Sequence, residues 1–225
     1  MNVLNFIHAF FSDGAHWQGY DGIPTRLGEH AGYTLEALAL AAAVGLPVGL
    51  LTGHYGRGGN ALSMVATAGR ALPTFGLLVL MTLLLGFGML PVMIPLVVLA
   101  VPPILVTTYE AVRSVDPSPV DAARGMGMRE SGILFRVELP VALPLILGGL
   151  RSAAIQIVST ATIAAYVSLG GLGRYIVDGL YQRDYEKVVG GASLTAVMAL
   201  ATLAVFWAVA RVAVSPGVRR GDPKA

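Results

Sequence analysis

The sequence predicts an all-α integral membrane protein with about five transmembrane helices. Its mean hydropathy is +0.71, 55% of its residues are hydrophobic and only 12% are charged, whereas about 25% are charged in an average soluble protein. Because these few charges cannot cover the apolar surface in water, we expect a lipid bilayer to surround the protein. A charged segment at 113–138, called the polar segment below, separates two of the apolar stretches.

Five apolar stretches each approach the roughly 20 residues that a helix needs to cross the hydrocarbon. The second stretch contains Arg70, and the fourth contains Arg151. The second stretch has an alternative, in which 58–70 forms a cytoplasmic helix and the span begins near Ala71. The five predicted spans are 33–53, 61–88, 90–112, 139–166 and 189–212.

The basic residues predict how these spans are oriented. If the polar segment lies in the cytoplasm, nine of the 15 Lys and Arg residues fall inside, four fall outside and two lie within spans. Cytoplasmic loops carry an excess of Lys and Arg. We therefore expect the N-terminus outside and the C-terminus in the cytoplasm.

The remaining regions divide the chain further. Residues 1–32 are expected to be extracytoplasmic, either as a short helix whose aromatic rings lie at the membrane interface or as a frayed arm. A transmembrane domain is expected at 33–212, with the polar segment on one side and an outer loop at 167–188 on the other. The basic, Pro- and Gly-rich residues 213–225 predict a flexible cytoplasmic tail.

Several function classes are excluded by what the sequence lacks. There is no cysteine, so neither a disulfide nor a thiolate metal site is expected. The four histidines show no HExxH spacing, and Gly56–Gly59 lacks the lysine of a phosphate-binding loop. A net charge of +2 is too small to indicate a nucleic-acid partner. We therefore expect neither a metal site nor an ATPase site in this chain.

The polar segment contains a compact motif that suits contact with a partner. Alanines and glycines leave part of its surface without bulky side chains, its arginines offer positive charge to a partner or to anionic headgroups, and Asp121 suits the positive end of a helix dipole. Leu139 and Pro140 then open the fourth span, because proline is tolerated in a first helical turn. The motif residues are Asp121, Ala122, Ala123, Arg124, Gly125, Met126 and Gly127.

With these residues the chain resembles the permease subunits of bacterial ABC importers. Their pattern is Glu-Ala-Ala, three residues, Gly, nine residues and Ile-x-Leu-Pro. This chain has Asp121-Ala122-Ala123, Gly127 and Val137-Glu138-Leu139-Pro140 with every spacing kept, and it departs from the pattern at Asp121 and Val137. The resemblance implies an importer-permease (MetI-like) core and a multi-pass place in the bacterial inner membrane.

Within that family the chain is most similar to the osmoprotectant branch, which imports glycine betaine, choline, carnitine or proline. The similarity covers about residues 33–205 and includes ELPVALPLILGGLRSA and TATIAAYVSLGGLGRYIVDGL. Permeases for methionine or phosphonate share much of this layout and remain alternatives. An ion-coupled secondary transporter is less favoured. Such proteins often show inverted repeats and membrane-buried carboxylates, whereas this sequence shows no clear repeat and no acidic residue at mid-membrane.

The resemblance also implies partners and roles. A pair of cytoplasmic ATPase subunits would hold ATP and Mg, a second permease of the same or a paralogous chain would complete the path, and an extracytoplasmic protein would bind the solute. Residues 121–132 would form the coupling helix that seats in a groove of the ATPase.

Other polar residues have a structural and a functional interpretation. Arg70 and Arg151 either line a water-filled path or pair with an acid, for which Glu110 is a candidate, or they snorkel to the cytoplasmic headgroups in a structural role, which is favoured. A polar stripe in the fourth span suits hydrogen bonds between helices better than contact with cargo; it consists of Ser159, Thr160, Thr162 and Tyr166. The outer loop suits docking of the solute-binding protein, through Gly170, Gly171, Gly173, Arg174, Asp178, Arg183 and Asp184. Gly45, Gly49 and Gly53 predict close helix packing.

Overall fold

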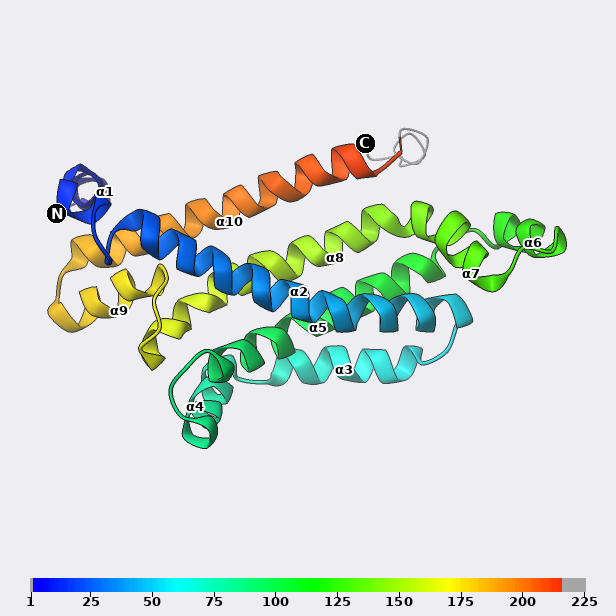
Figure 1. Ribbon diagram of the computed structural model, residues 1–225, viewed down its shortest axis with the longest axis horizontal. Helices are drawn as coiled ribbons and strands as arrows, with labels where there is room; N and C mark the ends of the chain where they lie inside the picture. Colours follow the sequence, from blue (N-terminus) through cyan, green and yellow to red (C-terminus); the bar gives the residue numbers. More distant parts are fainter. Residues whose placement is uncertain (1, 216–225) are drawn as a thin grey trace. The chain divides into compact units, whose positions relative to one another are not determined.

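The computed structural model describes residues 2–215, apart from the side chains of Ser63 and Arg70. Residues 216–225 of the predicted flexible tail lie outside this range. The described residues form helices joined by short turns, and no strand occurs among them (Figure 1). In order along the chain, these elements are α1 (Val3–Ser12), η1 (Gly14–Trp17), α2 (Ile23–Tyr55), α3 (Gly59–Ala71), α4 (Thr74–Leu85), α5 (Leu90–Arg113), α6 (Pro117–Gly125), α7 (Glu130–Ile133), η2 (Leu134–Glu138), α8 (Leu139–Thr160), η3 (Ala161–Val167), α9 (Gly173–Gln182) and α10 (Tyr185–Ala213).

Within residues 2–215, four helical stretches are long and apolar enough to cross a membrane. The third and fifth predicted spans correspond to α5 and α10 and are confirmed. The other two qualifying stretches extend beyond the predicted ends, because α2 begins at Ile23 and the stretch containing α8 runs over Glu130–Val167. Polar residues near both ends had hidden these extensions in the sequence.

The second predicted span is divided at Leu72 and Pro73 into α3 and α4. Proline lacks the N–H that a continuous helix needs, so its position explains the break. Helices of 13 and 12 residues are each shorter than the roughly 20 needed to span. A fifth span therefore exists only if α3 and α4 cross together. The division lies close to the alternative boundary predicted at Ala71.

The chain forms two compact units, each assembled from separate parts of the sequence. Unit 1 contains the residues up to Ala39 together with Leu72–Ala100 and Ala154–Thr202. Unit 2 contains Leu40–Ala71, Val101–Ala153 and the residues from Leu203 onward. Both units hold a candidate functional cluster, and each is described below by itself.

In unit 2, the glycines of α2 allow it to pack closely against α5, as predicted. A Cβ placed on Gly49 would lie 2.7 Å from Thr108 Cβ, and one on Gly53 would lie 2.8 Å from Val112 Cβ. Such distances are shorter than real side-chain contacts, so only glycine fits here. Around this contact the buried core consists of Ala111, Val112, Ala142 and Ile146, with Leu46 and Leu50 packed against it.

In unit 1, α1 packs into the protein through Phe10. This side chain is fully buried in a cluster with Ile23, Leu172, Tyr175 and Leu194. The N-terminal residues thus form a helix, which is one of the two predicted alternatives, and its central aromatic ring belongs to the core of unit 1. Val3 and Leu4, by contrast, are exposed at the start of α1.

Candidate functional site

The helix of the polar segment begins earlier than its motif suggested. Asp116 caps α6 by accepting a hydrogen bond from the backbone N–H of Ser118 at 2.9 Å, and Pro117 occupies the first turn. Both residues are favoured at these positions. Asp121 therefore lies in the middle of α6 instead of near its start. Gly127, with a φ of 81°, makes the turn that ends the helix.

The two alanines of the motif point in different directions. Ala123 is only 3% exposed and packs inside unit 2, so it does not form part of an accessible low face as predicted. Ala122 is exposed, and Met126 at the end of α6 is 79% exposed. Any partner of α6 would therefore contact the face that carries Ala122 and Met126.

A chain of ion pairs connects α6 to α7. The Nε and Nη2 atoms of Arg124 donate to the two carboxylate oxygens of Glu130 at 2.9 and 3.1 Å. Its Nη1 atom also lies 3.2 Å from Asp121 Oδ1. The hydrogen bonds that Arg124 donates to Glu130 raise the pKa of Arg124, so the guanidinium stays charged. Figure 1 shows α6 and α7 side by side, joined by a tight turn.

His54, near the end of α2, contacts two carboxylates of the polar segment. Its Nδ1 atom lies 2.6 Å from Glu138 Oε2, and its Nε2 atom lies 3.1 Å from Glu130 Oε2. The imidazole side chain is only 3% exposed and that of Glu138 only 8%. Three elements of unit 2, α2, α7 and η2, are thus joined at one buried side chain.

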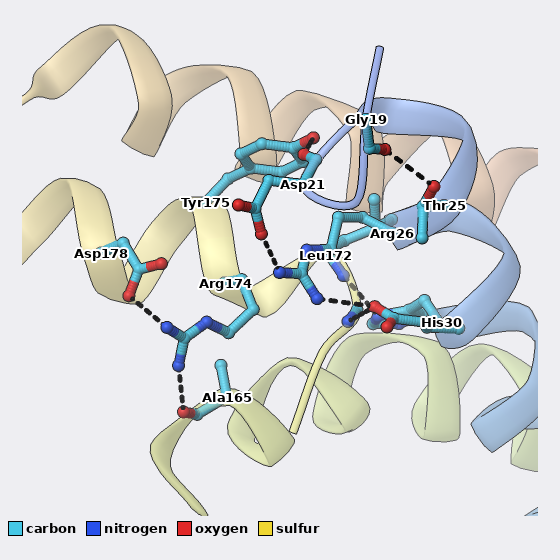
Figure 2. A network of polar contacts seen from close by, with 12 residues as sticks. Gly19, Asp21, Thr25, Arg26, His30, Ala165, Leu172, Arg174, Tyr175 and Asp178 are labelled. Carbon is cyan, nitrogen blue, oxygen red and sulfur yellow. Dashed lines mark hydrogen bonds and ion pairs between the residues drawn. The ribbon is translucent and has the colours of Figure 1, made fainter. Parts of the chain in front are cut away.

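In unit 1, a second polar cluster holds the glycine-rich turn before α9. The carboxylate of Glu29 accepts hydrogen bonds from Arg26 at 2.9 Å and from the backbone N–H of Gly171 at 2.7 Å. Arg26 is also paired with Asp21, as Figure 2 shows. Gly171 has a φ of 87°, a conformation that favours glycine.

His30 completes the attachment of the same turn. The fully buried ring accepts a hydrogen bond at Nδ1 from the Leu172 N–H at 3.2 Å (Figure 2). Its Nε2 atom lies 2.9 Å from the Val158 carbonyl. Because a carbonyl only accepts, Nε2 must carry the proton. The ring therefore acts as a neutral link between α2, α8 and the turn.

The predicted docking residues do not share one surface. Gly171 and Gly173 are buried within unit 1, so they shape the turn and present no surface to a partner. Arg174 and Asp178 form an ion pair at 3.1 Å on α9 (Figure 2). Together with Asp184, these two side chains line a cavity of about 600 Å³. Gly170 is half-buried and Arg183 is exposed.

The candidate pairing of Glu110 with an intramembrane arginine is not seen for Arg151. Glu110 and Arg151 are both exposed within unit 2, and their side chains are not joined by an ion pair. The backbone of Arg70 belongs to α3, but its side chain lies outside the described atoms.

The polar stripe of the fourth span also differs from its prediction. Ser159 and Thr162 donate to backbone carbonyls one turn earlier, those of Ile155 and Ser159, instead of bonding to another helix. Thr160 is the last residue of α8. Tyr166 is half-exposed and packs edge-on against Phe75 of α4 with ring centroids 5.3 Å apart.

The sequence reasoning missed the residues that connect these clusters. Asp21, Arg26, Glu29 and His30 fell in the predicted extracytoplasmic arm, and His54 was considered only as a metal ligand. The one available signal was the concentration of ionisable residues at the ends of apolar stretches. Their partners lie far away in sequence, so no local pattern reveals them.

Comparison with known proteins places this chain in a family. Residues 45–220 match the family described as binding-protein-dependent transport system inner membrane component. The carnitine transport permease protein OpuCB of Listeria monocytogenes is 31% identical over 197 residues, which are 88% of each chain. The choline transport system permease protein OpuBB of Bacillus subtilis is 32% identical over 172 residues, 76% of this chain and 79% of the relative.

Solved structures share the fold. One described as an inward-facing conformation of the MetNI methionine ABC transporter superposes with a TM-score of 0.72 at 22% identity, covering 84% of this chain and 94% of the other. This match agrees with the four helical stretches that can cross a membrane and with the motif at Asp121–Pro140. The chain belongs to the family of binding-protein-dependent transport system inner membrane components, and it is a membrane transport subunit.

Proposed function

We propose that this chain is the permease subunit of an ATP-driven importer for glycine betaine, choline or carnitine. The observation that carries the proposal is the similarity to permeases named for these solutes, at 31% and 32% identity over most of the chain. The three solutes share a quaternary ammonium group, so a common path is chemically reasonable. The likeness to a methionine transporter, at 22% identity, supports the fold alone.

The proposed complex contains this chain, a second permease, two cytoplasmic ATPase subunits that hold ATP and Mg, and an extracytoplasmic solute-binding protein. Helix α6 would rest against the ATPase through the exposed Met126 and Ala122. Closure of the ATPase pair would then move α6 and bias the permease between two packings, one open to each side of the membrane. Arg174, Asp178 and Asp184, which line the cavity of unit 1, are the proposed contacts for the binding protein.

Uptake measurements test this proposal. The complete transporter, produced in a strain without other osmolyte importers, should accumulate labelled glycine betaine, choline or carnitine in an ATP-dependent manner. Labelled proline and methionine serve as competing candidates. Accumulation of methionine alone, or uptake that persists without an ATPase subunit, would contradict the proposed solute class or the proposed energy source.

A further inference from the structure

His54 lies where the polar segment meets α2, and both its ring nitrogens face carboxylate oxygens. Nδ1 lies 2.6 Å from Glu138 Oε2, and Nε2 lies 3.1 Å from Glu130 Oε2. An ionised carboxylate only accepts hydrogen bonds, so a ring nitrogen that carries a proton donates to the carboxylate that it faces. One imidazole thus connects α2 to two carboxylates of the polar segment.

The same network reaches α6. Glu130 faces Nε2 of His54 and accepts from two nitrogens of Arg124, at 2.9 and 3.1 Å. Hydrogen bonds between charged groups are shorter and stronger than neutral ones, and a bidentate pair also fixes the orientation of its two side chains. A continuous line of such bonds thus runs from α6 through α7 to α2.

Burial divides this line into a fixed and an adjustable part. The side chains of His54 and Glu138 are 3% and 8% exposed, so separating them would leave the buried Glu138 carboxylate without its partner at high cost. Glu130 and Arg124 are 45% and 50% exposed, and water can replace either partner of this pair. Glu130 is therefore the bridge that can be removed without unfolding the buried pair.

We propose that His54 is a positioning residue for transport, which receives the movement of α6 through Glu130 and passes it to α2. This inference rests on the proposed function, because it takes α6 as the contact with the ATPase. His54 itself touches neither nucleotide nor the exposed face of α6. Its contribution is to keep α2 attached to the polar segment, so that displacement of α6 is passed on to α2 while the Glu130 bridge is intact.

The test removes the bridge by Glu130→Ala in the purified complex, reconstituted in lipid vesicles. The variant should assemble with the ATPase and hydrolyse ATP, and its KM for labelled glycine betaine, choline or carnitine should be unchanged. The maximal uptake rate should fall about tenfold, which corresponds to a typical coupling free energy. The number of solute molecules imported per ATP should fall by the same factor.

A second variant addresses the histidine itself. His54→Gln alone would leave the buried Glu138 without its imidazole partner, so the double variant His54→Gln with Glu138→Gln is used, which buries no charge. It should also assemble and show the same lowered import per ATP. Glu36→Ala, which removes an exposed carboxylate in unit 1, is the matched control and should import normally.

The outcomes separate this inference from the proposed function. Normal import per ATP in both variants would overturn the role of His54. Loss of ATPase association in Glu130→Ala, with the fold retained, would also overturn it, since Glu130 would then serve docking instead of transmission. Failure of the unaltered chain to co-purify with any ATPase would instead overturn the proposed function.

Discussion

The ring of Phe10 packs directly on the backbone of Gly190, so that α1 is held against the first turns of α10. A methyl group added to Gly190 would overlap this ring. Phe10 is fully buried, and its ring also stacks on that of His16 with centroids 4.3 Å apart. The contact attaches the N-terminal residues to unit 1.

The first prediction follows from this contact. Gly190→Ala should lower the free energy of unfolding by about 1–3 kcal/mol, the usual cost of inserting a methyl group into a packed core. Thermal unfolding in detergent measures the change. Gly28→Ala is the control, because a Cβ at Gly28 has no neighbour within 4 Å, and it should leave the protein as stable or slightly more stable. Equal melting temperatures for the two variants would contradict the packing.

The second prediction concerns the exposed end of α6. Met126→Asp places a charge on a side chain that is 79% exposed, so the fold should be unaffected. If this face contacts the ATPase, an unpaired charge there should prevent association, because it would be desolvated without a partner. Co-purification from membranes measures the association, with Leu4→Asp on α1 as the control. Unchanged association of Met126→Asp would place the contact elsewhere.

The third prediction concerns the attachment of the turn before α9. Glu29→Ala removes the acceptor for the Gly171 N–H, which it holds at 2.7 Å, and a buried donor without a partner costs about 1–3 kcal/mol. The amides of residues 170–173 should exchange with solvent faster than in the unaltered chain. Glu36→Ala, at an exposed position of the same helix, should not change this exchange. Slow exchange at 170–173 in Glu29→Ala would contradict the attachment.

The fourth prediction is a pH dependence. Burial raises the pKa of Tyr175 to about 12, and its hydroxyl donates to the Asp21 carbonyl at 2.5 Å. Since the folded state holds the proton more tightly than the unfolded chain, where the pKa is about 10, this stabilisation is complete below pH 10. It is lost as the pH rises through the pKa of the folded state. Subtracting the ultraviolet titration of Tyr175→Phe from that of the unaltered chain should isolate a transition near pH 12. A transition near pH 10 would contradict the burial.

The apolar stretches predicted much of the helical arrangement. The predicted span 90–112 matches α5 to within one residue, and 189–212 lies inside α10. The start of α2 was missed because Arg26, Glu29 and His30 suggested a polar arm. In the structure these side chains neutralise or hydrogen-bond one another and the turn before α9. Such compensation is not visible in a hydropathy pattern.

The candidate site was located in sequence but not resolved in detail. The motif spacing identified the polar segment, yet helical periodicity places Ala123 inside and Met126 outside. With the cap at Asp116, Pro117 and Pro119 open α6 ahead of the motif. The ion pair of His54 joins residues 84 positions apart, and only the tertiary structure brings them together.

The central claim, that α6 of the polar segment contacts an ATPase, has a direct test in this chain. Because the sequence contains no cysteine, Met126→Cys provides a unique site for a short thiol cross-linker, and Leu4→Cys provides the control. Cross-linking in membranes that contain the assembled transporter should join the Met126→Cys chain to the ATPase, and should not join the Leu4→Cys chain to it. An assembled transporter that gives no such adduct from Met126→Cys would contradict the claim.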